Sequence, residues 1–141
     1  MPVVDHANEN SGLVAYFSHG LEGSDNVKPV LLNKLAKQFL EEPTFNQLRT
    51  KEQLGYVVFV MNHCVRDSIG NFILIQSPGK CCSHMINRVN AHMVTMADKM
   101  VELSDEDFKV KVGAIMTGLE EKDKNLTETF NRFWGQEFAA H

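Results

Sequence analysis

The sequence lacks the features that mark disulfide-rich, secreted and membrane-spanning proteins. Its three cysteines are an odd number and two of them, Cys81 and Cys82, are adjacent, so we expect no disulfide framework. No apolar run approaches the roughly 20 residues that cross a bilayer. The first ten residues show neither the basic region nor the apolar run of a secretion signal. We therefore expect a cytoplasmic protein with no membrane partner.

A block of positive charge is also missing. The chain carries 14 Lys and Arg against 18 Asp and Glu, a formal net charge of −4, and no segment is strongly basic. Proteins that hold a phosphate backbone need clustered cations, because the release of counterions drives that binding. Nucleic acid is therefore not an expected partner, and the same balance argues against a domain that binds polyanions.

The common patterns for catalysis and metal binding are absent as well. The six histidines, at positions 6, 19, 63, 84, 92 and 141, form neither His-x-x-Glu-His nor His-Glu-x-x-His. The cluster at 81–84 lacks the Cys-x-x-Cys spacing by which two thiolates share a metal. The pairs at 18–19 and 63–64 are sequence neighbours, which point to opposite faces of a strand and cannot easily share a proton. We expect no metal ligand and no catalytic residue in this chain.

What the chain does contain is enough apolar sequence for one core. With 43% hydrophobic residues among 141, a single globular domain is predicted and a second is not. Residues 1–11 are polar and irregular and are predicted to be a lead-in. The domain itself is predicted to occupy residues 12–141.

The first half of this domain is predicted to contain a strand, a core helix and a hairpin. Residues 13–17 form the strand, and the helical period of apolar residues over 31–40 predicts a core helix that Pro43 ends. The uncharged, β-branched runs 56–61 and 72–75 predict two strands of an antiparallel hairpin with a long turn. Both runs are apolar on both faces, so helices are expected on one side of the sheet and another layer or subunit on the other.

A short helix between the core helix and the hairpin contains the most informative residues. Phe45 and Leu48 supply its inward face, and it stops at Gly55. Arg49 precedes that stop and Tyr56 begins the next strand, so both polar groups are expected to reach one edge. There they can donate hydrogen bonds to a peptide carbonyl and favour negative charge on its oxygen. The alternative is that Arg49 is a solvated charge and Tyr56 a strand residue with its hydroxyl at the rim.

The second half is predicted to be helical. Apolar residues step by three or four over 84–103, which indicates a long amphipathic helix. A capping box at 104–107 opens another helix, and a third is predicted to begin at Asn125 and to reach Trp134. The buried stripe of the middle helix is predicted to be Phe108, Val112, Ile115 and Leu119. The resulting order, β-α-α-β-β-α-α-α, predicts an α+β fold in which helices pack on an antiparallel sheet in two layers.

One motif resembles a known family. The stretch Leu48-Arg-Thr-Lys-Glu-Gln-Leu-Gly-Tyr56 is similar to a motif in the C-terminal half of the pitrilysin family, the inverted-zincin metallopeptidases, above all in the insulin-degrading enzyme and nardilysin group. The likeness extends to segments 41–48, 72–76 and 133–135. It therefore covers about residues 13–138, most of the chain.

The resemblance implies the two-layer domain of this family, in which four related domains form two halves that enclose a peptide. It implies that Arg49 hydrogen-bonds the substrate backbone, that Tyr56 helps to hold the scissile carbonyl, and that Leu54 and Gly55 are structural members of the motif. Zinc and its His-x-x-Glu-His ligands belong to the N-terminal half of such an enzyme. This chain is therefore expected to bind no cofactor, to be inactive alone, and to be a C-terminally truncated domain.

Two functional hypotheses follow. The first is a non-catalytic domain of a zinc metalloendopeptidase of the insulin-degrading type, which contacts the peptide substrate and closes the chamber with the N-terminal catalytic half as its partner. The second is a truncated, non-enzymatic module that binds a peptide or a protein on the uncovered apolar sheet face. The identity of the peptide, the origin of the truncation and a homo-oligomeric state stay open.

Overall fold

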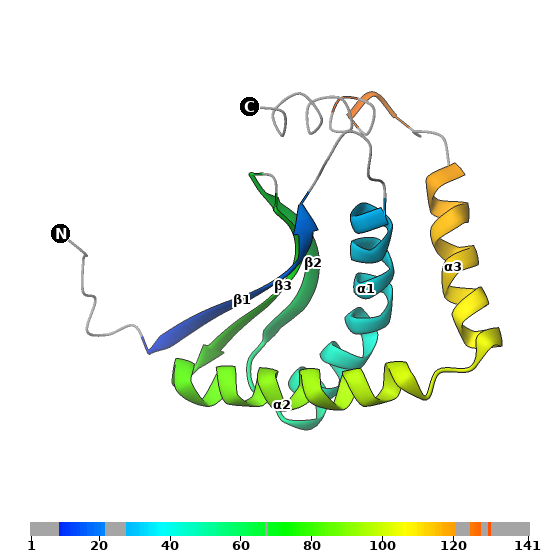
Figure 1. Ribbon diagram of the computed structural model, residues 1–141. Coiled ribbons are helices and arrows are strands. Elements are labelled where there is room, and N and C mark those ends of the chain that lie inside the picture. The colour runs from blue at the N-terminus through cyan, green and yellow to red at the C-terminus, as the bar shows by residue number, and fades with distance from the viewer. Residues whose placement is uncertain (1–8, 22–27, 67, 121–124, 128–129, 131–141) are drawn as a thin grey trace.

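A three-stranded antiparallel sheet packed against helices forms the body of the protein (Figure 1). The computed structural model describes residues 9–21, 28–66, 68–120, 125–127 and 130. The α+β architecture predicted from the sequence is confirmed. The elements follow in the order β1 (Asn10–Leu21), α1 (Lys28–Thr44), the π-helix η1 (Phe45–Lys51), β2 (Val57–Val65), β3 (Ser68–Pro78), α2 (Cys82–Val101) and α3 (Asp105–Glu120).

Strand β3 is the centre of the sheet, with β1 and β2 antiparallel on either side of it. The predicted hairpin of 56–61 with 72–75 is confirmed. The prediction of a long turn between these strands is wrong. The pairing continues to Val65 and Ser68, so only two residues connect the strands. Arg66 in this connection has a left-handed φ of 53°. Such backbone matches the twist of the paired strands, so a two-residue connection suffices.

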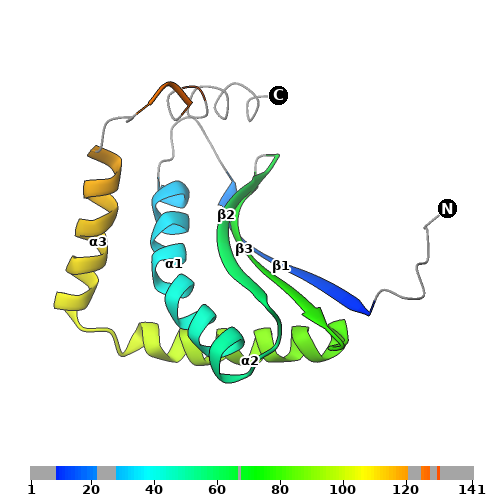
Figure 2. The same ribbon diagram turned by 180° about the vertical axis from the view of Figure 1, so that it is seen from behind.

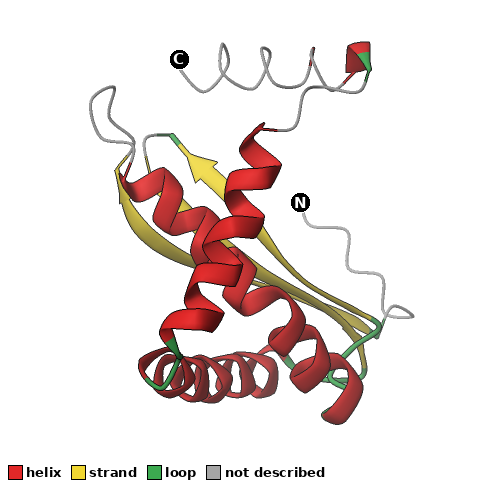
Figure 3. Cartoon of the chain, turned by 90° about the vertical axis from the view of Figure 1, so that its right-hand side faces the viewer, coloured by secondary structure: helices red, strands yellow, loops and turns green. Residues whose placement is uncertain are grey.

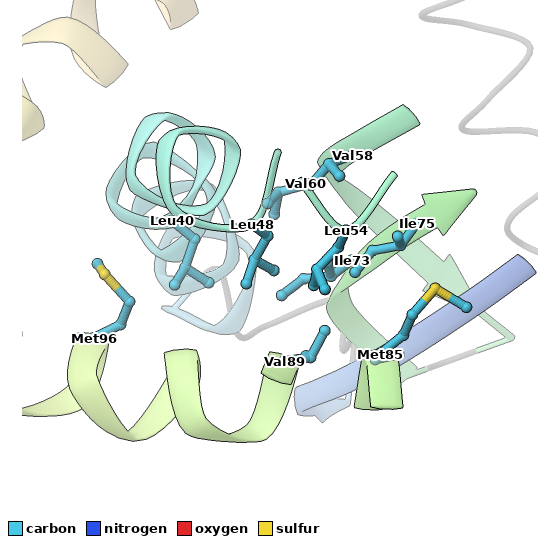
Figure 4. Packing of buried hydrophobic residues seen from close by; sticks show 11 residues of the cluster. Leu40, Leu48, Leu54, Val58, Val60, Ile73, Ile75, Met85, Val89 and Met96 are labelled. Atoms are coloured by element: carbon cyan, nitrogen blue, oxygen red, sulfur yellow. The ribbon is translucent and has the colours of Figure 1, made fainter. Parts of the chain in front are cut away.

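The described helices lie on one side of the sheet, and the core fills the space between (Figure 3). Strand side chains alternate between the two faces, so every second residue of each strand meets the helices. The helices α1 and α2 and the turns around η1 supply the opposing apolar residues (Figure 4). The cluster consists of Ala15, Leu40, Leu48, Leu54, Val58, Val60, Ile73, Ile75, Met85, Val89 and Met96.

The prediction that Pro43 ends the first helix is wrong. α1 continues through Pro43 to Thr44 and runs directly into η1. Proline lacks the N–H that an α-helical turn needs and crowds the carbonyl four residues earlier. The helix nevertheless continues past Pro43 and widens directly after it, from Phe45 onwards. In the wider turn Leu48 is fully buried, as predicted, whereas Phe45 is 40% exposed rather than inward-facing.

The two later helices differ in how much they bury. Met85, Val89 and Met96 of α2 are buried, which confirms the amphipathic pattern over 84–103. The buried stripe predicted for α3 is wrong, since none of its residues is buried and Phe108 is 44% exposed. Figures 1 and 2 show the reason: α1 stands between α3 and the sheet, so among the described elements α3 packs against α1 and not against the sheet.

The beginnings of the later helices are only partly described. Ser104 caps α3 as predicted, because its Oγ accepts the N–H of Asp107 at 3.1 Å. Leu126 and Thr127 are helical, near the start predicted at Asn125, while Trp134 lies outside the described residues. Within the described part of the chain, no helix is both long and apolar enough to cross a membrane.

Gly55 lies where the chain enters β2, pressed against the backbone of β3. A Cβ at this position would come 2.1 Å from the carbonyl oxygen of Gln76. A carbon and an oxygen atom that are not bonded cannot approach so closely. The oxygen belongs to the backbone, so it cannot move aside as a flexible side chain would. Only glycine therefore allows the backbone at position 55 to lie this close to the backbone of β3.

We predict that Gly55→Ala lowers the free energy of unfolding by about 3 kcal/mol, because the added methyl group forces the two backbones apart. Urea denaturation measures the change. Gly12→Ala in β1 is the control, since a Cβ there would have no atom within 4 Å. Equal stabilities of the two variants would show that Gly55 is not held by this contact.

Candidate functional site

Arg49 and Tyr56 line the same open hollow, at the place where the end of η1 meets the end of β3. The structure thus brings together the two residues that the sequence singled out. The hollow has a volume of about 480 Å³ and is lined by Arg49, Thr50, Gln53, Leu54, Gly55, Tyr56, Ser77 and Pro78. It is a surface depression large enough for a few residues of an extended peptide.

The end of η1 explains how these two residues come to share the hollow. The helix stops at Lys51, four residues before the stop predicted at Gly55. Gln53 takes a left-handed φ of 51°, and the N–H of Leu54 then donates to the carbonyl of Leu48 at 3.0 Å. Leu54 is only 1% exposed, so its burial turns the chain back into the core. The segment between the two leucines is left at the surface.

The polar groups of the hollow are available to a ligand. The Arg49 guanidinium lies over the ring of Phe45, with its central carbon 5.0 Å from the ring centroid. Tyr56 is 52% exposed. Arg49 is also exposed, and within the described residues no hydrogen bond to another protein group is found for either side chain. The residues that line the hollow therefore include one with a cationic donor and one with a phenolic donor.

Glu52 joins the site segment to α2. Arg88 Nε donates to Glu52 Oε2 at 2.7 Å, and Arg88 Nη2 donates to Oε1 at 2.8 Å. Gln47 Nε2 also donates to Oε1, at 2.8 Å. The hydrogen bonds from Arg88 lower the pKa of Glu52 to about 2. The carboxylate is therefore ionised and held at neutral pH.

A second polar contact joins α2 to the residue before η1. Thr44 Oγ1 and His92 Nε2 lie 3.0 Å apart, and both residues are buried. Burial lowers the pKa of His92, so the ring is neutral at pH 7. Sequence reasoning missed Glu52, Arg88, Thr44 and His92, because no local pattern relates residues that lie 36 and 48 positions apart.

A metal site is not formed by the part of the chain that the structure describes. No three His, Cys, Asp or Glu side chains in these ranges come together closely enough to hold an ion. Zinc, which the resemblance implies for the catalytic half of the enzyme, does not fit the residues present here.

The chain is similar to proteins of known family. Residues 35–134 match the family described as PQQ synthase PqqF-like, C-terminal lobe domain 4. The chain is 38% identical over 129 residues to insulin-degrading enzyme-like 1, peroxisomal, of Arabidopsis thaliana, covering 91% of this chain and 13% of the relative. It is 30% identical over 133 residues to human insulin-degrading enzyme, covering 94% of this chain and 13% of that protein.

A solved structure gives the same result for the fold. The crystal structure of pitrilysin superposes with a TM-score of 0.74 at 28% sequence identity, covering 86% of this chain and 13% of that one. The chain thus spans about one eighth of the length of the relatives it matches, given as 13% in each comparison.

We predict that the contact of Glu52 with Arg88 weakens in acid. The folded-state pKa of about 2 lies below the ordinary value of 4.5, so the stabilisation is fully present above about pH 4.5 and is lost as the pH falls towards 2. Glu52→Gln removes the charge at every pH. The difference in unfolding free energy between wild type and Glu52→Gln, measured by urea denaturation, should shrink over this range. A difference that is constant from about pH 6 to about pH 2 would contradict the assignment.

Proposed function

Because the chain belongs to the pitrilysin (insulinase) family, as a domain of the C-terminal lobe, we propose that it is a substrate-contacting domain of a peptide-degrading enzyme. In this role it binds the backbone of a peptide and helps to close the chamber in which the peptide is cut. The zinc and the catalytic residues belong to the N-terminal half of that enzyme. By itself the chain cleaves no peptide.

The observation that carries this proposal is the shared hollow of Arg49 and Tyr56. A guanidinium and a phenol on one wall can donate to a peptide carbonyl, and both donors interact more strongly as negative charge grows on that oxygen. Gly55 supports the same wall, because the close approach of the chain to Gln76 fixes the start of β2 beside Tyr56. The names of the relatives support a peptide as the ligand, since one is named insulin-degrading enzyme and another insulin-degrading enzyme-like.

A second candidate function is favoured by the outer face of the sheet. No Asp, Glu, Lys or Arg occupies an outward position on any of the three strands, and several large apolar side chains are exposed there. Uncharged apolar surface of this kind is typical of a binding interface. A non-enzymatic module would use it to bind an apolar extended peptide. The outward positions are Asn10, Gly12, Val14, Tyr16, Ser18, Leu21, Val57, Phe59, Met61, His63, Val65, Ser68, Gly70, Phe72, Leu74, Gln76 and Pro78.

We predict that Tyr56→Phe and Arg49→Ala, made in the complete enzyme that contains this domain, each lower kcat/KM for a fluorogenic peptide. The loss for Tyr56→Phe should be on the order of 10²-fold, because one donor to the developing oxyanion is removed. Arg49→Ala should mainly raise KM, since it removes a contact to the substrate backbone. Both side chains are exposed, so Tm should hardly change.

Lys109→Ala on the exposed surface of α3 is the control for loss of a positive charge. Unchanged kinetics for both site variants would leave Arg49 and Tyr56 as structural residues and would remove the basis of the proposal.

The two candidate functions are distinguished by adding the N-terminal catalytic half. Peptidase activity that requires both parts, and that a metal chelator abolishes, supports the domain of an enzyme. Peptide binding by this chain alone, unaffected by Arg49→Ala but weakened by Phe59→Ser on the outer face of the sheet, supports the binding module instead.

A further inference from the structure

Helix α2 contacts the segment that carries Arg49 at both of its ends. His92 bonds to Thr44, the residue immediately before η1, and Arg88 bonds to Glu52, the residue immediately after it. Arg88 and His92 are four positions apart in α2, so they lie on the same face of that helix, one turn from each other. Figure 2 shows the turns that follow α1 crossing α2, and η1 contacts α2 there.

The contact at the end of η1 is strong for its position. Arg88 donates two N–H groups to the two carboxylate oxygens of Glu52. This two-pronged geometry fixes the relative orientation of the two side chains and strengthens their interaction. Gln47 donates to the same carboxylate from within η1, one turn of the π-helix earlier. Glu52 therefore accepts hydrogen bonds from both η1 and α2, and it joins the end of η1 to that helix.

The contact at the start of η1 is weaker but enclosed. Thr44 is fully buried and His92 nearly so, and a buried hydroxyl or ring nitrogen that loses its partner destabilises the fold. The two ends of the segment are thus fixed by different means. One is held by a charged, two-pronged contact and the other by a buried neutral one.

A π-helix needs such support. It is much rarer than the α-helix and occurs mostly as single turns, often at functional sites. Seven residues in this form, held only by their own hydrogen bonds, could rewind towards an α-helix and change the direction in which Arg49 points. Anchoring Thr44 and Glu52 to two points on α2 fixes the distance that the seven residues of η1 span. Rewinding towards an α-helix changes that length, so the two contacts oppose it.

We propose that Arg88 and His92 of α2 are positioning residues that hold η1 in its π-helical form and so fix Arg49 relative to Tyr56. The part of this inference that concerns peptide binding rests on the proposed function. The part that concerns η1 does not. Neither residue touches the hollow, since both lie beside a separate cleft between η1 and α2.

The first test measures the end of η1 directly in the 141-residue chain. The amide of Leu54, which bonds to the carbonyl of Leu48 only while η1 ends as described, should exchange with solvent on the order of tenfold faster in Arg88→Gln. Arg88→Lys keeps the charge but loses the two-pronged geometry, so it should restore only part of the protection. Lys37→Gln, which breaks the exposed contact with Glu41 in α1, is the matched control and should leave Leu54 unchanged.

The start of η1 is tested with Thr44→Val and Thr44→Ser. Valine keeps the volume and removes the hydroxyl, whereas serine keeps the hydroxyl that meets His92. Faster exchange of the Leu54 amide in Thr44→Val, with protection retained in Thr44→Ser, is expected. Unchanged exchange in both Arg88→Gln and Thr44→Val would overturn the proposal, because η1 would then keep its form without α2.

The second test measures peptide affinity by titration of the labelled chain with an extended peptide of the kind cleaved by the complete enzyme. Arg88→Gln should weaken binding on the order of tenfold, because Arg49 is no longer aimed at the hollow. Adding Arg88→Gln to Arg49→Ala should cause little further loss, since the two changes act through the same guanidinium. A merely structural role would instead give losses that add.

The outcomes separate the two proposals. If Arg49→Ala weakens peptide binding and Arg88→Gln does not, the positioning role is overturned while the proposed function stands. If Arg49→Ala has no effect on binding, the proposed function fails. Hydrogen exchange of the Leu54 amide alone then tests whether α2 keeps η1 in its π-helical form.

Discussion

The burial of Leu48 and Leu54 is the constraint on which the rest of this structure depends. Both leucines lie in the core, 0% and 1% exposed, and the chain between them must leave the interior and return within five residues. The hydrogen bond from the Leu54 N–H to the Leu48 carbonyl closes that excursion. Arg49 follows the first leucine and Tyr56 comes shortly after the second. Burying the two apolar side chains thus places two polar ones at the surface, close together.

The surroundings of this excursion are all fixed by tertiary contacts. Gly55 meets the backbone of β3, and Glu52 meets Arg88 on α2. The result is an unusual helical form, a left-handed residue and a close backbone contact within a dozen residues. Such features persist only where the surrounding structure determines them, and they gather at sites that bind ligands.

The sequence was informative where physical requirements are local. Leu48 was correctly placed inside and Ser104 at a helix start, because the helical period and the capping hydroxyl act over a few residues. The α+β class followed from the order of apolar patterns, and the family followed from one motif and is confirmed by the match over residues 35–134. Arg49 and Tyr56 were expected at one edge, and they do line one hollow. Their roles toward a peptide remain predictions.

The features that only the tertiary structure decided share one physical reason. Each depends on contacts with residues that are distant in the sequence. Pro43 normally ends a helix, but here the helix continues in a wider form whose ends contact α2. The apolar stripe of α3 resembles any buried stripe, but α1 separates it from the sheet and leaves it half covered. The sequence by itself determined the class and the family, and it singled out Arg49 and Tyr56 as candidates. The direction in which those residues point was decided by packing, because helix form and side-chain burial respond to whatever lies across the fold.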